Sequence, residues 1–458
     1  MSNAKIFNQD VAYDFYTNEK YIDNLVYHTG YSLFYIYKDG HYNKLKPEEF
    51  RKLVIKHIRD KFPRQNWTIN SVKDIVSWVE HECIRQTEEE HRYYIGFKDC
   101  VYNTKTFKTE PHDIEKIVTY YLPYNFSELE NCPIPNWNRF LDTSLVCVDG
   151  YTPDNKLHLV AQEAFGSIFI DNLKASKAYF FYGESGQNGK STFTNILRKV
   201  VGKEFHSALS LSDLSKQFGL SALIGKKANI CDELDDKFGS SKMFKQLVTG
   251  EPVSDRHIYG ETFTLYNRAK FFYSTNVMPT FDGLDGGLRR RLLIIPFYRE
   301  FKNNDIDKDY DLSEKLDEEL PGIIYWAIQG AKRLVENSYR FTESEATTKM
   351  MEEFEDEAST ALRYFRDNCA IDSTNISWIP LQKIYDDYLH WAVSEGAKKP
   401  VGKKKFFKDI RTTWRNIEQK TIRYNDGGMF NGQATSCVNV IFKVDIITDE
   451  AEIKKLNM

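Results

Sequence analysis

A glycine-rich stretch in the middle of the chain has the residue types that hold phosphate groups. It reads FFYGESGQNGKST over residues 180–192 and ends in Gly189, Lys190 and Ser191. A P-loop has a glycine, four further residues and then Gly-Lys-Ser/Thr. Here Gly183 lies six positions before Gly189 rather than five. The same letters also suit an ordinary glycine-rich turn, so the surrounding sequence has to decide between the two.

That surrounding sequence favours a phosphate site. An apolar strand is expected over 179–182, and a helical apolar stripe follows in Phe193, Ile196, Leu197 and Val200. A strand, a glycine-rich turn and a helix direct free backbone N–H groups and the helix dipole at an anion. We therefore expect Lys190 to contact the β- and γ-phosphates of ATP, Ser191 to bind Mg²⁺ and Thr192 to assist nearby. Gly186 is expected to absorb the additional residue. The full set of expected nucleotide contacts is Gly183, Gly186, Asn188, Gly189, Lys190, Ser191 and Thr192.

An acidic pair follows the next apolar run. The segment KKANICDELDD places Asp232 and Glu233 directly after residues 228–231. We expect Asp232 to hold the Mg²⁺ ion through water and Glu233 to polarise the attacking water. A run of carboxylates by itself is more often a solvated surface, but the strand before it and the loop upstream favour a catalytic role.

Two more polar positions come in an order that suits ATP hydrolysis. Asn276 ends the apolar segment AKFFYSTN, where an amide next to the γ-phosphate can orient the lytic water. Arg290 and Arg291 follow in GGLRRRLLIIPF. In a ring of subunits such arginines reach the γ-phosphate of the neighbour and stabilise charge in the transition state. Each position alone has a bland explanation, but the ordered set predicts an ATPase.

Composition sets limits on the class of protein. The chain has 458 residues, 41% hydrophobic and 28% charged, and a formal net charge of −4. These values are typical of a globular protein of several domains, which we expect to work in the cytoplasm. Its seven cysteines contain no CxxC pair, which argues against a disulfide framework and a zinc finger. No apolar run is long enough to span a membrane, so no membrane partner is expected. Any nucleic-acid contact must come from local positive charge.

The pattern of strands and helices predicts four regions in an α/β protein. Hairpins are expected at Asp39-Gly40 and within CVYNTKTFKTE, and a helix along Phe50, Val54 and Ile58. Short apolar runs at 178–182, 228–231, 271–273 and 292–295 predict the buried strands of one sheet. The expected regions are a mixed α+β domain over 1–150, a P-loop motor over 151–305, a helical lid and linker over 306–370 and a C-terminal domain over 371–458.

The C-terminal region contains a strongly basic helix. Residues 398–423 have ten lysines and arginines against Asp409 and Glu418. The helix is expected over about 402–418, after a helix at 379–395 and before strands with a turn at Gly427-Gly428. Its apolar positions are Phe407, Ile410, Trp414 and Ile417, and its basic positions are Lys404, Lys408, Arg411 and Arg415. Helix, helix and strand pair predict a winged-helix-like DNA-binding domain. A merely solvated basic face is the alternative.

Taken together, these motifs resemble those of superfamily 3 helicases, the AAA+ ring motors of viruses and mobile elements. Lys190, the pair Asp232-Glu233, Asn276 and the arginines carry the resemblance. It is greatest for the phage and plasmid primase-helicase family, with the poxvirus primase-helicase among the relatives. The segments FKDCVYNTKTFKTEPHDIEKIVTYYLPYNF and LDEELPGIIYWAIQGAKRLVEN also look like that family, so the resemblance covers about residues 40–395.

The resemblance implies a homo-hexameric ATPase that moves on single-stranded DNA during replication of a phage, plasmid or genomic island in a bacterial host. It also implies a DNA-gripping hairpin between the acidic pair and Asn276. The segment VSDRHIYGETFTL occupies that position, with Arg256, His257 and Tyr259 as candidate DNA contacts. The family usually has a lysine where this chain has Gly260. The 150 residues ahead of the motor contain no paired-aspartate metal motif and no zinc ligands, so we expect priming to be either absent or supplied by another protein, a separate primase.

Two other functions fit parts of the sequence. The chain could be an origin-binding initiator in which ATP controls assembly without unwinding duplex DNA. It could also be a packaging or protein-remodelling ATPase, which agrees with the P-loop but not with the family-wide resemblance. Glu233, Asn276 and the arginines favour real ATP turnover, because a pure switch does not need them.

Overall fold

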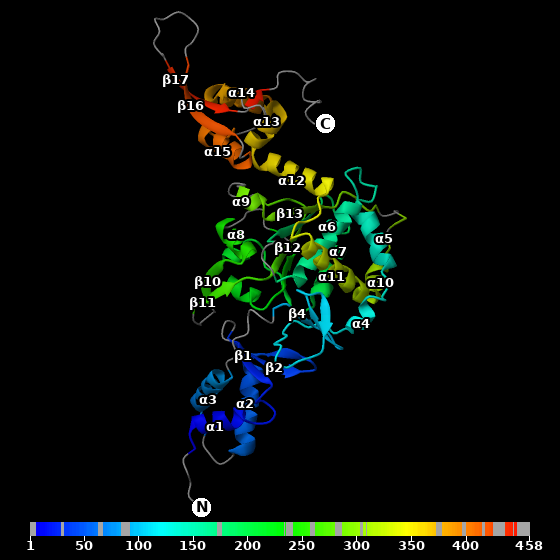
Figure 1. Cartoon of the computed structure of the whole chain (residues 1–458), viewed down its shortest axis with the longest axis vertical. Helices are drawn as coiled ribbons and strands as arrows, with labels where there is room; N and C mark the ends of the chain where they lie inside the picture. The colour runs from blue at the N-terminus through cyan, green and yellow to red at the C-terminus, as the bar shows by residue number, and fades with distance from the viewer. Residues whose placement is uncertain are drawn as a thin grey trace, which may run out of the picture.

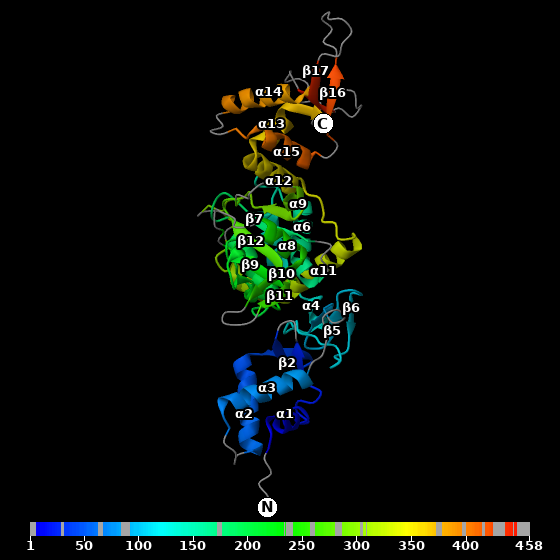
Figure 2. The same ribbon diagram turned by 90° about the vertical axis from the view of Figure 1, so that its left-hand side faces the viewer.

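The computed structural model arranges the chain as three tiers along one long axis (Figure 1 and Figure 2). The N-terminal tier lies at one end, the parallel-sheet domain in the middle and the C-terminal tier at the other end. The residues that it describes are 6–28, 32–62, 67–83, 92–171, 176–232, 234, 241–256, 262–279, 286–302, 306–307, 309–371, 378–395, 400–414, 417–424, 436–442 and 444–446.

The N-terminal tier packs three helices against a small antiparallel sheet. Its elements are α1 (Asn8–Tyr16), β1 (Leu25–His28), β2 (Leu33–Lys38), β3 (His41–Leu45), α2 (Pro47–Lys61) and α3 (Ile69–Glu82). Phe50, Val54 and Ile58 are buried on α2, as their spacing predicts. The predicted hairpin at Asp39-Gly40 is confirmed. These residues have φ angles of 54° and 82°, the left-handed values that a two-residue turn between twisted strands requires.

A second antiparallel sheet links this tier to the middle of the molecule. It consists of β4 (Tyr94–Gly96), β5 (Val101–Asn103) and β6 (Lys108–Glu110), and the hairpin predicted in CVYNTKTFKTE is its β5–β6 pair. The helices α4 (Phe126–Leu129) and α5 (Pro135–Ser144) follow. Trp137 on α5 is fully buried in the same apolar cluster as Phe165 and Phe193. The core of the middle tier therefore begins before residue 150.

The middle tier is built on a five-stranded parallel sheet. Its strands are β7 (Ala178–Tyr182), β8 (His206–Ser207), β9 (Ala228–Cys231), β12 (Lys270–Thr275) and β13 (Leu292–Pro296). They lie in the order β13-β7-β12-β9-β8, and all neighbours are parallel. Helices cover both faces, which is why the strands are nearly continuous apolar runs. The predicted α/β class and four predicted strands are confirmed.

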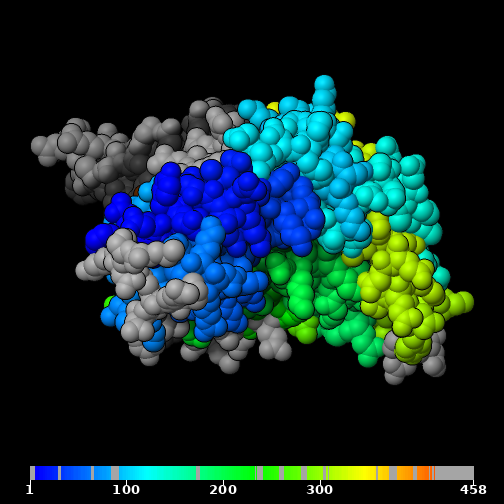
Figure 3. Space-filling view, turned by 90° about the horizontal axis from the view of Figure 1, so that it is seen from below, coloured from blue at the N-terminus to red at the C-terminus, as the bar shows by residue number. Residues whose placement is uncertain are grey.

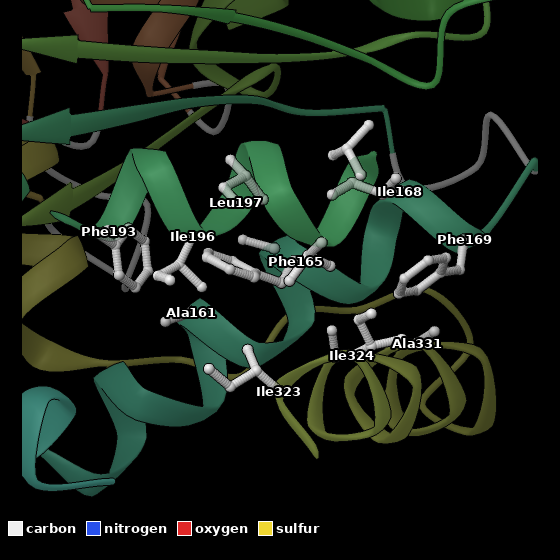
Figure 4. Close-up of a cluster of buried hydrophobic side chains, with 14 of the residues drawn as sticks. Ala161, Phe165, Ile168, Phe169, Phe193, Ile196, Leu197, Ile323, Ile324 and Ala331 are labelled. Atoms are coloured by element: carbon white, nitrogen blue, oxygen red, sulfur yellow. The ribbon is translucent and has the colours of Figure 1, made fainter. Parts of the chain in front are cut away.

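One face of the sheet is covered by three helices that share a core. They are α6 (Asn155–Gly166), α7 (Lys190–Val201) and α11 (Leu320–Glu336). Figure 4 shows Phe165 of α6, Leu197 of α7 and Ile324 of α11 in this cluster. On the other face, α8 (Ser241–Thr249) and α12 (Glu345–Ala358) bury Phe244, Met350 and Phe354. The helix α11, expected as part of a lid, belongs to the same apolar core as the helix of the P-loop.

Helices α6 and α11 cross at a distance that only glycine permits. A Cβ atom on Gly330 would lie 2.1 Å from the carbonyl oxygen of Gln162, and one on Gly166 would lie 2.2 Å from the amide nitrogen of Ala331. Beside this crossing, Arg333 of α11 forms a 2.9 Å ion pair with Glu163, whose side chain is fully buried. Thr342 also donates to that carboxylate, from its amide at 2.8 Å and its hydroxyl at 2.7 Å.

The C-terminal tier is a helical cluster beside short strands. Its elements are α13 (Thr360–Asn368), β14 (Cys369–Ile371), β15 (Trp378–Pro380), α14 (Leu381–Ser394), α15 (Lys403–Thr413), β16 (Glu418–Tyr424), β17 (Ser436–Phe442) and β18 (Val444–Ile446). The sheet order is β15-β17-β16. The predicted helix 379–395 is confirmed as α14. The basic helix is shorter than predicted, because Glu418 already pairs with Phe442 in a strand. Residues 427–428 lie outside the described residues.

The region expected as a helical lid and linker, residues 306–370, contains four helices among its described residues. They are α10 (Leu312–Glu318), α11, α12 and α13. Residues 340–344 between α11 and α12 are not helical, and Thr342 in this segment is held by Glu163. The described residues contain no helix with the length and hydrophobicity needed to span a membrane.

The glycine crossing predicts that Gly330→Ala destabilises the protein. Helix propensity alone would favour alanine by about 1 kcal/mol. The added methyl would overlap the Gln162 carbonyl, and such overpacking costs about 1–3 kcal/mol or more. We expect a lower midpoint of thermal unfolding, measured by calorimetry. Gly402→Ala, with open space around its Cβ position, is the control and should change the midpoint less. A Gly330→Ala protein as stable as the parent would contradict the close crossing.

Candidate nucleotide site and nucleic-acid-binding surfaces

The glycine-rich loop lies at the carboxyl end of β7 and leads directly into α7. Gly189 has a φ of 89°, a left-handed value that favours glycine, and a Cβ there would lie 2.9 Å from the Ser144 hydroxyl. A Cβ on Gly183 would lie 2.2 Å from the side-chain nitrogen of Asn188. Gly183 and Gly189 are therefore required by the fold of the loop, because a side chain at either position would clash.

The additional residue of the loop is accommodated at Gln187. Gln187 has a φ of 56°, and its carbonyl accepts a 2.8 Å hydrogen bond from the amide of Phe301. Gly186 was expected to take up the extra residue, but its φ is not in the left-handed range and its Cβ position is open. The loop is thus fixed from outside, by the segment that follows β13.

Lys190 is the cation of the glycine-rich loop, and burial perturbs its pKa. Its ammonium group donates to the carbonyl oxygens of Gly183 at 2.9 Å and Ser185 at 3.4 Å, and the residue is only 5% exposed. Burial lowers its pKa from 10.5 to about 8. No carboxylate in the described part of the chain pairs with this ammonium, so an approaching phosphate can supply the missing negative charge.

The other predicted loop residues divide into bracing and exposed positions. Asn188 is buried and donates a 2.8 Å hydrogen bond to the Ser185 carbonyl, so it braces the loop. Ser191 is exposed on the first turn of α7. Thr192 is half-buried and faces a cavity beside the loop. A hydroxyl and a carboxylate are ligands that Mg²⁺ accepts, so Ser191 and Asp232 have suitable donor types for that ion.

Asp232 lies at the carboxyl end of β9, as predicted, but its carboxylate is paired with an arginine. Arg198 of α7 donates to it at 2.6 Å and also to Asn195 at 3.0 Å. Arg198 is a residue that the sequence reasoning missed. The sequence did contain a signal for Arg198. It lies at helical spacing after Ser191 and Asn195, and therefore on the same face of α7 as the predicted metal ligand Ser191. Glu233 lies outside the described residues.

Asn276 is brought to the P-loop by strand register. It follows β12, whose last residue Thr275 pairs with Tyr182 at the end of β7. The amide of Gly183 donates to the Thr275 carbonyl at 3.3 Å. The side chain of Asn276 is exposed at this edge. Because β12 lies between β7 and β9, Asn276 stands between the loop and the acidic strand.

A cavity of about 220 Å³ adjoins the P-loop on the side of α5. Phe140, Phe301 and Leu312 give it apolar walls, and Gln187, Gly189 and Thr192 of the loop border it. Asp307 in its wall pairs with Arg299 at 2.7 Å and with Arg139 at 3.4 Å. These walls come from segments before and after the sheet, so the sequence reasoning did not find them.

The two predicted finger arginines lie at the opposite edge of the sheet. Arg290 and Arg291 precede β13, and the Arg291 carbonyl accepts a 2.7 Å hydrogen bond from the amide of Ala178, the first residue of β7. The P-loop follows the last residue of that five-residue strand. At ~3.3 Å per residue, β7 separates them by ~16 Å. The side chains instead donate to Gly286 and Gly287 carbonyls at 3.0 Å and 2.6 Å.

The expected DNA-gripping segment is bordered by a β-hairpin. Its strands β10 (Pro252–Arg256) and β11 (Thr262–Tyr266) are antiparallel, and they lie at the end of the middle tier that faces the N-terminal tier (Figure 1 and Figure 2). Arg256 is exposed and lies 5.1 Å from the ring centre of Phe218. His257, Tyr259 and Gly260 lie outside the described residues.

The basic helix α15 has a buried and an exposed face. Phe406, Phe407 and Ile410 are buried in the core of the C-terminal tier, of which Phe406 was not predicted. Lys404, Lys408 and Arg411 are exposed. Arg415 lies outside the described residues, and Trp414 and Ile417 come after the helix ends. Three of the four predicted basic positions thus form one exposed stripe.

Two family models match separate parts of the chain. Residues 14–146 match a model described as "D5 N terminal like", and residues 181–291 match a "Family of unknown function (DUF5906)". The first match covers the N-terminal tier and continues into α5. The second runs from the end of β7 to Arg291, and so includes the P-loop, Asp232, Asn276 and the arginine pair.

Several curated viral proteins are similar in sequence. "Putative helicase L207/L206" of Acanthamoeba polyphaga mimivirus is 24% identical over 256 residues, 52% of this chain and 25% of that protein. "Primase D5" of Fowlpox virus (strain NVSL) is 27% identical over 198 residues, 39% of this chain and 25% of that protein. "Uncoating factor OPG117" of Vaccinia virus (strain Western Reserve) is 30% identical over 184 residues, 35% of this chain and 21% of that protein. The chain spans a quarter or less of the length of these relatives.

A solved structure has a similar fold along nearly the whole chain. It is "The A form apo structure of NrS-1 C terminal region-CTR", with a TM-score of 0.50 and 14% sequence identity, covering 96% of this chain and 99% of the other. The chain is thus similar in sequence to D5-like viral proteins named as helicase and primase, and in fold to the NrS-1 C-terminal region.

Proposed function

We propose that this chain is an ATP-driven replicative DNA helicase, an AAA+ motor of superfamily 3 that works as a homo-hexamer. The observation that carries the proposal is the meeting of three polar elements at one edge of the parallel sheet. Lys190 follows β7, Asp232 follows β9 and Asn276 follows the strand between them. Ligands of open α/β sheets bind outside the carboxyl ends of the strands, where these residues lie. The D5-like relatives named as helicase and primase support a role in replication.

The residues divide the chemistry of ATP hydrolysis among themselves. The amides at the start of α7 and the Lys190 ammonium bind the phosphates. Ser191 and Asp232 would hold Mg²⁺, which neutralises charge that develops on the phosphates. Glu233 is assigned to polarise the attacking water and Asn276 to orient it. The cavity bordered by Phe140 and Phe301 receives the base.

The position of the arginine pair supports a ring. Arg290 and Arg291 are ~16 Å of strand away from the P-loop of their own chain, which exceeds the reach of an arginine side chain. A contact with a γ-phosphate therefore requires a second copy of the chain. In this arrangement one subunit binds ATP and its neighbour completes the charge stabilisation of the transition state.

A second function, origin recognition, is favoured by α15. The apolar face of this helix is fixed in the C-terminal core and its basic stripe faces solvent. The order of helices and strands around it, with sheet order β15-β17-β16, supports a winged-helix-like reader of duplex DNA. The chain then both recognises an origin and unwinds it. A separate primase partner remains part of the proposal.

The first test removes the Lys190 ammonium. Lys190→Ala should abolish ATP turnover and the unwinding of a forked DNA duplex, both measured against the parent protein. A chain that unwinds the fork without ATP, or equally well with Lys190→Ala, would contradict the proposed motor. A parent protein that binds ATP but never separates strands would favour the initiator without unwinding.

Lys190 also predicts how ATP binding by the parent protein depends on pH. The Lys190 pKa is about 8 in the free protein, and a bound phosphate raises it, so ATP binding takes up a proton above pH 8. Phosphate groups themselves are fully ionised at that pH. Calorimetry in buffers of different ionisation enthalpy measures this uptake, and ATP affinity should fall as the pH rises beyond 8. Lys190→Ala should lose the uptake. Lys270→Met should keep it, because Lys270 has a pKa near 8 but lies at the far end of β12.

The second test asks whether the arginines act between subunits. Arg290→Ala and Arg291→Ala should keep ATP binding and lose on the order of 10³-fold in turnover. Mixing either variant with Lys190→Ala protein should restore part of the activity, since some interfaces then combine an intact Lys190 with an intact arginine. Arg340→Ala, an exposed arginine after α11, should leave turnover unchanged. Absence of rescue at every mixing ratio would contradict an action in trans.

The third test concerns α15. A Lys404→Ala/Lys408→Ala/Arg411→Ala variant should bind duplex origin DNA more weakly and retain basal ATP turnover. Each lost phosphate contact should reduce the slope of log affinity against log salt by about 0.9. Lys332→Ala is the control, because it also removes an exposed positive charge, but from α11 rather than from α15. Unchanged duplex affinity in the triple variant would place recognition elsewhere in the chain.

A further inference from the structure

A large cleft lies between the N-terminal tier and the middle tier. Its volume is about 1370 Å³. One wall comes from the β1–β3 sheet and the segment 117–124, and the other from the carboxyl end of α7, the residues after it and β11. Figure 3 shows this end of the molecule, where the N-terminal residues lie against the green middle tier. None of the described residues that form it belongs to the P-loop.

The cleft is strongly cationic. Eight lysine and arginine side chains line it, against the two carboxylates of Asp171 and Glu204. Some of these cations are already paired, as Arg198 is with Asp232. Four others have no ion-pair partner within the described parts of the chain: Lys44, Lys203, Lys227 and Arg268. They come from both walls, so their charges face a shared space.

The cations of the two walls act on one another. Burial lowers the pKa of Lys226, and the positive charge of Lys44 lowers it further. Burial also lowers the pKa of His206, with added repulsion from Arg198 and Lys226. Like charges gathered in a recess cost free energy that a polyanion relieves. This field distinguishes the cleft from an ordinary surface groove of a chain with net charge −4.

Aromatic rings lie among these cations. Tyr266, at the end of β11, is 56% exposed, so its ring is accessible from the cleft. Tyr121 is half-buried and stacks on His41, with ring centres 3.7 Å apart and planes at 4°. The Lys227 ammonium lies 5.2 Å from the ring centre of Tyr120. Rings placed between cations are how proteins hold unpaired bases and the backbone that joins them.

We propose that this cleft binds single-stranded nucleic acid, with phosphates held by Lys44, Lys203, Lys227 and Arg268 and a base stacked on Tyr266. The exposed ring favours a single strand over a duplex, whose bases are already stacked. Tyr266 is the last residue of β11, which begins at Thr262, directly after residues 257–261 of the expected DNA-gripping segment. The cleft thus extends the hairpin surface toward the N-terminal tier. The site deepens the proposed motor function, because it would hold the strand on which a helicase moves, but strand binding here requires neither ATP nor a ring.

The test measures binding of a fluorescein-labelled oligothymidylate of about 15 nucleotides, close to the upper site size of single-strand-binding folds, without nucleotide present. A Lys44→Ala/Lys203→Ala/Arg268→Ala variant should bind more weakly and lose about 2 from the log–log salt slope, at about 0.7 for each contact. Lys349→Ala, an exposed lysine on α12, should change nothing. Lys190→Ala should bind like the parent, which separates this result from any failure of the motor proposal.

A second variant tests the stacking. Tyr266→Ala should weaken binding by about 5- to 150-fold, the range for loss of one base–ring stack, and Tyr266→Trp should restore it. Tyr151→Ala, at a tyrosine outside the cleft that is 78% exposed, is the control. Oligouridylate in place of oligothymidylate distinguishes RNA from DNA, and binding of either strand supports the proposal. It is overturned if a duplex of the same length or polyglutamate competes as well as the single strand, or if the cleft variants bind like the parent.

Discussion

The hydrogen-bonded register of β7 with its two neighbours is the constraint on which the rest of the structure depends. β12 and β13 both run parallel to β7, and residues 178–182 pair with both strands. Parallel strands end at a common edge, so the strand register alone brings the glycine-rich loop, Asp232 and Asn276 to one side of the sheet. The same register sends Arg290 and Arg291 to the other edge. In the proposed motor, the geometry that gathers the nucleotide site in one chain also requires a second chain to supply the arginines.

The stability of this arrangement comes from the helices behind the loop. α7 cannot move without disturbing Phe193 and Leu197, which are buried against α6 and α11. The crossing of α6 and α11 at Gly166 and Gly330 allows this layer to pack tightly, and the Glu163–Arg333 pair fixes its outer end. A P-loop must hold its amides in place before the phosphate arrives, because reordering them would reduce the binding free energy. Tight packing of α7 supplies that rigidity.

Local features of the sequence predicted much of the fold and part of the site. Apolar runs defined the four long strands of the sheet, and Asp39-Gly40 defined a hairpin, since each signal lies within a few residues. The end of the basic helix was predicted too late, because Trp414 and Ile417 continue its helical apolar spacing although α15 ends at Thr413. The pairing of Arg198 with Asp232, and the walls supplied by Phe140 and Phe301, join segments far apart in the chain. These segments come together only because of the order of the strands in the sheet, and the amino-acid composition does not reveal that order.

Helix α7 connects the two charged regions of the middle tier. Lys190 begins it at the nucleotide site, and Arg198 and Lys199 near its other end line the cationic cleft. Arg198 also donates to Asp232, the carboxylate assigned to the metal ion. A guanidinium can serve a carboxylate and a phosphate, but their negative charges repel each other across it. If nucleic acid binds as proposed, a phosphate in the cleft would weaken the hold of Arg198 on Asp232 and favour a cation at that carboxylate. Under the two proposals, the Arg198–Asp232 pair would be an electrostatic connection between the cleft and the proposed nucleotide site.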